Sequence, residues 1–349
     1  MQSRQNSAAL AFMRPAALLA FVLVVAPFVL PFIGFNADLL TRVLIWGLFG
    51  IGFDLLFGFT GLLSFGHAVF FGTGGFACAY LIVNNVTTNV YLAMVAGVLA
   101  TVAVALFLGV FALRRSGIYF AMITLAAGEV AFFLDYSPLK PWTGGEDGLP
   151  GMVGPVIGFG QSAFHINAGW PLYAFVALLF WLGFLLARRL SRSPVGLILK
   201  GIGKNARRAG AVGNDVGRYK LLAFVISAVY AGLAGELLGM IQGFMPPGAF
   251  ALETSAQIIM VTVIGGVGTL LGPTVGAAVW FWLRDTLQYI PNIGGAWKLI
   301  LGLIFIALIV GLRRGICGEV LYRMRMRRTR VSGAGPVGAE EPSASAVPR

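Results

Sequence analysis

Charged residues are scarce in this sequence. Asp, Glu, Lys and Arg make up 11% of its 349 residues, whereas hydrophobic residues make up 58%, and the mean hydropathy is +0.87. A soluble protein carries roughly a quarter of its residues as charges, because they cover its surface. The composition therefore excludes an ordinary soluble domain and predicts an integral membrane protein.

Cysteine and histidine are also scarce, with two residues of each type. Cys78 and Cys317 lie far apart in the chain, so neither a disulfide framework nor a zinc site is supported. No nucleophile with its base and no cluster of metal ligands is evident, which argues against a membrane enzyme. The phosphate-loop pattern G-x-x-x-x-G-K-[ST] does not occur. We therefore expect no catalytic residue, metal or cofactor here, and any ATP hydrolysis must occur on another chain.

Long apolar runs account for most of the chain. A run of about 20 residues crosses the hydrocarbon core of a bilayer as one helix. The expected fold is all-α: a polytopic integral membrane protein with about 8–10 transmembrane helices, including broken or half-spanning segments. The full-length spans are expected at 15–33, 39–57, 65–83, 91–113, 117–135, 170–187, 219–242 and 296–312.

The stretch from Thr254 to Leu283 is too long for one ordinary crossing. GGVGT at 265–269 and Pro273 interrupt it, which predicts two short or half-spanning helices. Loops rich in Lys and Arg stay in the cytoplasm, and Arg4 and Arg14 place the N-terminus there. Two crossings in this stretch then bring the basic C-terminal tail to the same side, so both termini are expected in the cytoplasm.

One basic segment, SPVGLILKGIGKNARRAGAVG at 193–213, interrupts the apolar runs. Ser193 and Pro194 are typical of a helix start, and Gly213 is typical of a helix end. Apolar and basic residues alternate between them at helical spacing, which predicts an amphipathic cytoplasmic helix. Such a helix either lies on anionic membrane lipid or docks into a groove of a soluble protein. Its apolar positions include Val195, Ile198, Leu199, Ile202, Ala206 and Ala209.

Ionisable groups inside a bilayer are costly, so each is a candidate for a role. Glu129 either faces a polar pathway or holds two helices together. Glu236 is either a substrate determinant or a structural group at a close helix contact. Asp54 precedes a glycine-rich turn near a membrane boundary, which favours a solvated or a capping role over contact with substrate. His67, after Gly66, is either a packing or a pathway residue.

Five blocks resemble the LivM-type permease of branched-chain amino acid ABC importers. The likeness runs from about residue 39 to 315, in order and at familiar spacing. The blocks are GFDLLFGFTGLLSFGHAVFFGTGGF (52–76), SGIYFAMITLAAGEV (116–130), WTGGEDGLPG (142–151), GRYKLLAFVISAVYAGLAG (217–235) and VIGGVGTLLGPTVGAA (263–278).

The resemblance implies a permease of the bacterial inner (plasma) membrane that carries branched-chain or related amino acids, with urea or amides as the alternative solutes. The partners it implies are a homologous second permease, two cytoplasmic ATPase subunits and a periplasmic solute-binding protein. An ATP-independent secondary transporter remains a second alternative. Nucleic acid is not expected as a partner, although the net charge is +12, because the cations lie in short breaks between apolar runs.

The resemblance also assigns regions and residues. Residues 1–38 form the N-terminal end and first transmembrane helix, 39–315 the permease core with its coupling loop at 188–220, and 316–349 the basic and then disordered tail. Lys204, Ala206 and Gly210 stand where relatives commonly carry glutamates. The residues implied for ATPase coupling are the six apolar positions above and Gly213; for the pathway, Gly66, His67, Glu129 and Glu236; and for contact with the binding protein, Gly144, Gly145, Glu146 and Asp147.

Overall fold

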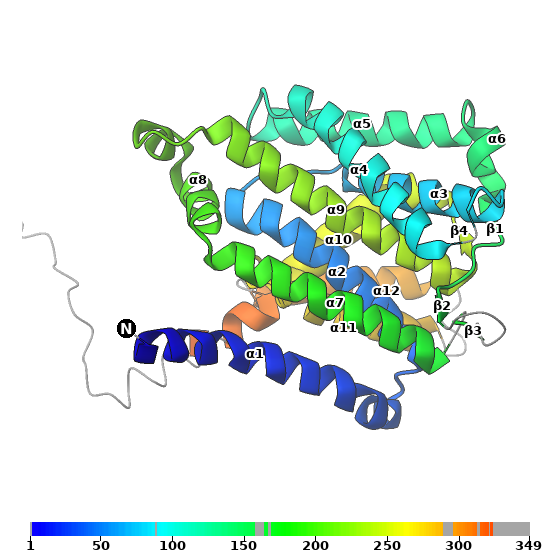
Figure 1. Ribbon diagram of the computed structural model, residues 1–349, viewed down its shortest axis with the longest axis horizontal. Coiled ribbons are helices and arrows are strands. Elements are labelled where there is room, and N and C mark those ends of the chain that lie inside the picture. The colour runs from blue at the N-terminus through cyan, green and yellow to red at the C-terminus, as the bar shows by residue number, and fades with distance from the viewer. Residues whose placement is uncertain are drawn as a thin grey trace, which may run out of the picture.

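The computed structural model describes residues 2–87, 89–157, 164–166, 169–288, 296–312, 315–320 and 322–323. Helices dominate, and the described strands are two residues long each (Figure 1). The predicted all-α fold is confirmed. The elements are α1 (Gln2–Val29), η1 (Leu30–Ile33), α2 (Ala37–Thr60), α3 (His67–Val83), α4 (Val90–Ala112), α5 (Ile118–Tyr136), α6 (Lys140–Thr143), η2 (Gly145–Asp147), β1 (Leu149–Pro150), β2 (Val156–Ile157), β3 (Phe164–His165), α7 (Gly169–Arg192), α8 (Pro194–Ala211), α9 (Val216–Gln242), β4 (Phe244–Met245), η4 (Pro247–Phe250), α10 (Leu252–Gly265), α11 (Gly272–Gln288) and α12 (Trp297–Gly311).

Six helices in the described part of the chain are long and apolar enough to cross a membrane. They are α2, α4, α5, α7, α9 and a segment at 297–320 that includes α12. Shorter apolar helices occur at 16–29, in α3 and in α10. Six of the eight predicted full-length spans correspond to the long helices, whereas the spans predicted at 15–33 and 65–83 correspond to shorter ones. The chain is a polytopic membrane protein.

The centre of the bundle is formed by α2, α3 and α9. Small residues allow these helices to approach closely, as is usual in membranes. A Cβ atom on Gly74 of α3 would lie 2.5 Å from the Cα atom of Gly232 on α9. Close approach at such points maximises dispersion contacts, which hold helices together where the surrounding lipid is equally apolar.

The stretch at 254–283 forms a broken hairpin, as predicted. At about 1.5 Å per residue, α10 and α11 span roughly 21 and 26 Å, less than the hydrocarbon core. They are joined by the loop 266–271 and pack on each other and on α2. A Cβ atom on Gly50 of α2 would collide with the ring of Pro273, so the start of α11 lies directly against α2.

Two different structures occupy the two ends of the bundle (Figure 1). α8 projects at one end, between α7 and α9. At the other end lie α6, the η2 turn and the antiparallel pair β1–β4, in which Leu149 is opposite Met245. The basic helix and the 144–147 turn are therefore at opposite ends of the molecule (Figure 1).

Candidate functional site

The basic helix α8 begins as the sequence predicts. Ser193 Oγ accepts a hydrogen bond from the Gly196 amide at 3.2 Å, and Pro194 occupies the first turn. The helix is not continuous, however, because Asn205 is extended at φ −160° and ψ 99°. Asn205 Oδ1 accepts a hydrogen bond from the Arg208 amide at 3.0 Å and so caps a second helical segment. The predicted single helix is thus two segments, and α8 ends at Ala211 shortly before Gly213, whose φ is +90°.

The most apolar part of α8 packs on its own chain. Leu199 is fully buried and Ile202 is 3% exposed, and α8 contacts α2, α7 and α9. The prediction that these two side chains anchor a partner is wrong, because the helix ends of the bundle already cover them. Val195, Ile198, Ala206 and Ala209 are half-buried. The exposed positions of α8 include Leu197, Lys200, Gly201, Lys204, Arg207 and Arg208, and Val212 and Gly213 just after it are exposed as well.

Glu129 lies near the middle of α5, on its exposed side. The same side carries large exposed apolar residues, among them Met122, Val130 and Phe133. The exposed side of α4, in contrast, carries no charge, because residues 90–112 contain no charged residue. A carboxyl group at this depth is costly in contact with lipid. This face of α5 therefore differs chemically from an ordinary lipid-facing surface.

Gly66 and His67 lie at the start of α3 and contact three other helices, α2, α5 and α9. A Cβ atom on Gly66 would lie 2.9 Å from the carbonyl carbon of Thr124, so α5 approaches here. His67 is fully buried, its Nε2 is 2.7 Å from Ser227 Oγ on α9, and its ring packs edge-on against Phe53. Of the two alternatives for His67, the geometry favours the packing role.

Glu236 on α9 is fully buried and lies among α3, α4 and α9. Its Oε1 occupies the space that a Cβ atom on Gly97 of α4 would need. Neither of its carboxyl oxygens has a hydrogen-bond partner among the described residues. Of the two alternatives for Glu236, this position favours the structural group at a helix crossing.

The turn 144–147 has a backbone conformation that depends on its two glycines. Gly144 and Gly145 have φ of +82° and +60°, in the left-handed region that disfavours other residues. Gly145 is buried, while Glu146 and Asp147 are exposed. Tyr136 at the end of α5 donates a hydrogen bond to Glu146 Oε1, which ties the turn to α5.

Asp54 on α2 is fully buried, and not solvated. Its Oδ1 accepts a hydrogen bond from the Gly268 amide at 2.6 Å, and its Oδ2 accepts one from the Leu270 amide at 3.1 Å. The side chain therefore binds backbone amides of the loop between α10 and α11. This is the type of contact that a capping role predicts. Its partners, more than 200 residues along the chain, carry no signal in the local sequence.

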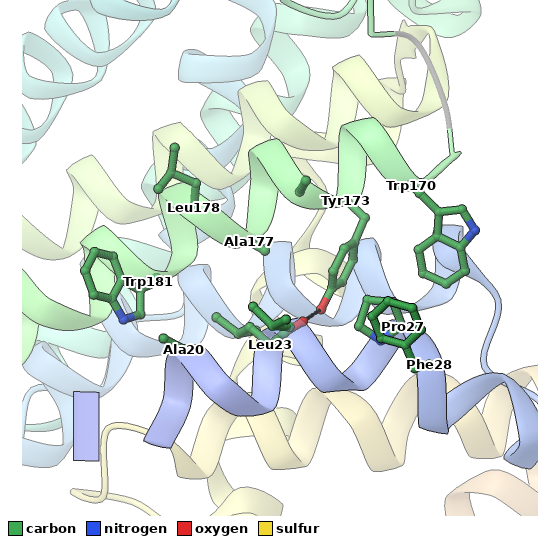
Figure 2. A pocket seen from close by; sticks show the side chains of 11 residues that line it. Ala20, Leu23, Pro27, Phe28, Trp170, Tyr173, Ala177, Leu178 and Trp181 are labelled. Carbon is green, nitrogen blue, oxygen red and sulfur yellow. Dashed lines mark hydrogen bonds between the residues drawn. The ribbon is translucent and has the colours of Figure 1, made fainter. Parts of the chain in front are cut away.

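An apolar groove of about 710 Å³ lies between α1 and α7 (Figure 2). The Tyr173 hydroxyl donates to the Leu23 carbonyl at 2.8 Å, and Trp181 Nε1 donates to the Ala16 carbonyl at 3.2 Å. These two polar groups are already bonded, and the lining contains no charged side chain. Its lining is Ala20, Leu23, Val24, Pro27, Phe28, Trp170, Tyr173, Ala174, Ala177, Leu178 and Trp181.

The fold and these sites define a class: a helical polytopic membrane protein with a basic helix at one end, a broken hairpin beside α2 and a carboxyl group on an exposed helix face. Among the described residues, no three His, Cys, Asp or Glu side chains come close enough to hold a metal ion. Residues 36–309 match the family described as the branched-chain amino acid transport system / permease component. This match covers most of the chain, and the chain belongs to that family.

Several curated relatives carry transport names. The chain is 27% identical over 272 residues to the high-affinity branched-chain amino acid transport system permease protein LivM of Salmonella typhimurium, and 28% identical over 279 residues to LivM of Escherichia coli. Each alignment covers 72% of this chain and 64% of the relative, so the chain spans less than two thirds of those proteins. The permease protein LivH of Salmonella typhimurium is 25% identical over 252 residues, which is 67% of this chain and 79% of LivH. Among solved structures there is no significant match.

Proposed function

We propose that this chain is a membrane-spanning permease subunit of an ATP-driven importer of the bacterial inner membrane. Its family and the names of its relatives support this role. The chain itself performs no chemistry in this proposal. ATP is hydrolysed by two cytoplasmic ATPase subunits, and a periplasmic binding protein delivers the solute.

The observation that carries the proposal is the exposed position of Glu129. Charged groups at membrane depth almost always face protein or a water-filled cavity, and not lipid. In the complete transporter, the exposed face of α5 therefore meets a homologous second permease, and the solute path runs between the two chains. The groove in Figure 2 is a less suitable path for a charged solute, because its lining contains no charged side chain.

The two ends of the bundle take the remaining partners. The exposed residues of α8 bind an ATPase subunit, and the half-buried positions Ile198, Ala206 and Ala209 form the edge of that contact. The turn at 144–147 lies at the opposite end and presents Glu146 and Asp147 to the binding protein. In this arrangement both termini are cytoplasmic.

The proposed solutes are branched-chain or related amino acids. This assignment follows the printed names of LivM and LivH, whereas another relative, LsrC of Klebsiella pneumoniae, is named for import of autoinducer 2. The binding protein does most of the selection in such a system. Measuring which solutes raise the melting temperature of the cognate binding protein identifies the class, because a bound ligand stabilises the folded state.

The test of the proposal is uptake into liposomes that contain this chain, the second permease and the ATPase pair, with binding protein and radiolabelled leucine outside. We expect uptake that requires enclosed ATP. Glu129→Leu should reduce uptake about tenfold, the loss expected when one polar interaction of about 1.4 kcal/mol disappears. Val130→Leu, on the same exposed side, is the matched control and should transport normally.

Two results would contradict the proposal. Uptake that continues without ATP and without the ATPase subunits would favour the alternative of a secondary transporter. Normal uptake by Glu129→Leu would show that the exposed face of α5 is not part of the path.

A further inference from the structure

The last two turns of α2 lie between two elements that are distant in the sequence. On one side is the loop 266–271 between α10 and α11. Both carboxyl oxygens of Asp54 accept hydrogen bonds from amides of this loop. Gly58, one turn later on the same face of α2, touches it as well, since a Cβ atom there would lie 2.7 Å from the Gly268 nitrogen.

On the other side is α8. A Cβ atom on Gly203 of α8 would lie 3.1 Å from the carbonyl carbon of Phe59, so the two backbones are in contact. Lys200 Nζ lies 4.6 Å from the centre of the Phe59 ring and donates a hydrogen bond to the Ser191 carbonyl at 3.1 Å. Together with buried Leu199 and Ile202, these contacts fix α8 to the end of α2.

The backbone conformation of the loop 266–271 is held by hydrogen bonds from neighbouring groups. Leu270 has φ +58°, an uncommon conformation for a residue with a branched side chain. Thr269 Oγ1 donates to the Gly266 carbonyl at 2.7 Å and accepts from the Gly272 amide at 3.0 Å. Such a conformation persists only where neighbouring groups hold it. Asp54 supplies two of the hydrogen bonds that do so.

We infer that Asp54 is a positioning residue that transmits movement of α8 to the α10–α11 hairpin. This inference rests on the proposed function, in which an ATPase subunit moves α8. The end of α2 follows α8 because their backbones are in contact. The loop follows α2 because the Asp54 carboxylate binds two of its amides, and α10 and α11 shift with the loop.

The carboxylate is suited to this role because it is an acceptor with two oxygens. Asparagine has nearly the same shape but presents an NH₂ group in place of one oxygen. That NH₂ group would face a backbone amide of the loop, donor against donor, and one of the two hydrogen bonds is lost. The variant Asp54→Asn therefore loosens the link while preserving the packing volume.

The first experiment uses the unaltered complex in nanodiscs and follows hydrogen exchange at the Gly268 and Leu270 amides. It compares the nucleotide-free state with the state that binds a non-hydrolysable ATP analogue. We expect the exchange rates of these amides to differ by about tenfold between the two states. Equal exchange in both states, in a complex whose α8 amides do respond to nucleotide, would overturn the inference.

The second experiment measures solute taken up per ATP hydrolysed in liposomes. For Asp54→Asn we expect stimulated ATP hydrolysis close to that of the unaltered complex and about tenfold less uptake per ATP, the loss of one charge-assisted bond. Asp38→Asn, at the exposed start of α2, is the matched control and should leave the ratio unchanged. Asp54→Glu keeps both acceptor oxygens and should restore part of the coupling.

The outcomes separate the inference from the proposed function. If the unaltered complex shows no ATP-dependent uptake, the proposed function is wrong, and the inference that rests on it is wrong as well. If the unaltered complex transports and Asp54→Asn lowers hydrolysis and uptake in proportion, or changes neither, Asp54 does not link the two. If Asp54→Asn does not assemble, the exchange experiment decides.

Discussion

The contact between α3 and α9 gives a quantitative prediction for Gly235→Ala. The added methyl group would overlap the carbonyl oxygen of Phe71 and lie 2.9 Å from its carbonyl carbon. Both are backbone atoms of α3, so no side chain can rotate away. The two helices must instead separate, by roughly 1 Å if ordinary contact distances are restored.

The cost follows from the packing that is lost. A gap of about 0.5–1 Å removes a quarter to a half of the attraction of each atom pair across the contact, and overpacking a core typically costs about 1–3 kcal/mol. Alanine recovers up to about 1 kcal/mol of helix propensity relative to glycine. Because the clash is with backbone atoms, the upper end of this range applies, and after the gain in propensity we expect Gly235→Ala to lower the free energy of unfolding by about 2 kcal/mol. The matched control is Gly302→Ala on α12, where a Cβ atom meets nothing within 4 Å.

The chain provides its own probe of unfolding. Cys78 on α3 is fully buried, and after Cys317→Ser it is the remaining thiol of the sequence. Labelling of Cys78 by a fluorescent maleimide during heating in detergent then reports the opening of the α3–α9 contact. Gly235→Ala should react at a lower temperature than the parent, and Gly302→Ala should not. Equal midpoints for the two glycine variants would refute the argument that backbone approach at Gly235 sets the stability of this contact.

Two further predictions test α1 and α8. Tyr173→Phe removes the hydrogen bond to the Leu23 carbonyl, and we expect hydrogen exchange of α1 to rise about fivefold for a loss of about 1 kcal/mol, while exchange of α9 stays constant; unchanged exchange of α1 would mean that this bond does not hold it. Leu197→Asp lies on the exposed side of α8 and should abolish solute-stimulated ATP hydrolysis in the reconstituted complex without changing the melting temperature. Leu199→Asp places a charge at a fully buried position and should prevent stable folding instead. Full stimulation of ATP hydrolysis in the Leu197→Asp complex would exclude α8 as the ATPase contact.

Much of the fold could be predicted because it depends on local sequence. Apolar runs define the membrane helices, since each helix satisfies its own backbone hydrogen bonds in lipid. The glycines and Pro273 define the break in the hairpin, and Ser193 and Pro194 define the start of α8. Asn205 is the exception within α8. Its side chain caps the second segment, and an asparagine inside a helical pattern gives only a weak signal of such a break.

The roles of the polar residues could not be predicted, because they depend on contacts between distant segments. His67 and Ser227 are 160 positions apart, and Asp54 and Gly268 are 214 positions apart. The helical spacing of apolar residues identifies the apolar side of a helix, but it does not show whether lipid, another helix of the chain or a partner covers that side. The hydropathy of α5 likewise gives no sign that Glu129 lies on the exposed side.

The same reasoning limits what can bind to α8. Because α2 and its neighbours cover Leu199 and Ile202, the large apolar residues that stay exposed here are Leu197 on α8 and Val212 just after it. Between them in the sequence stand the exposed cations Lys200, Lys204, Arg207 and Arg208. A groove that fits this surface must combine apolar pockets with acidic side chains, because burying the cations without partners would cost more than the apolar contacts return. Under the proposed function, the ATPase subunit that binds α8 therefore carries acidic side chains at this contact.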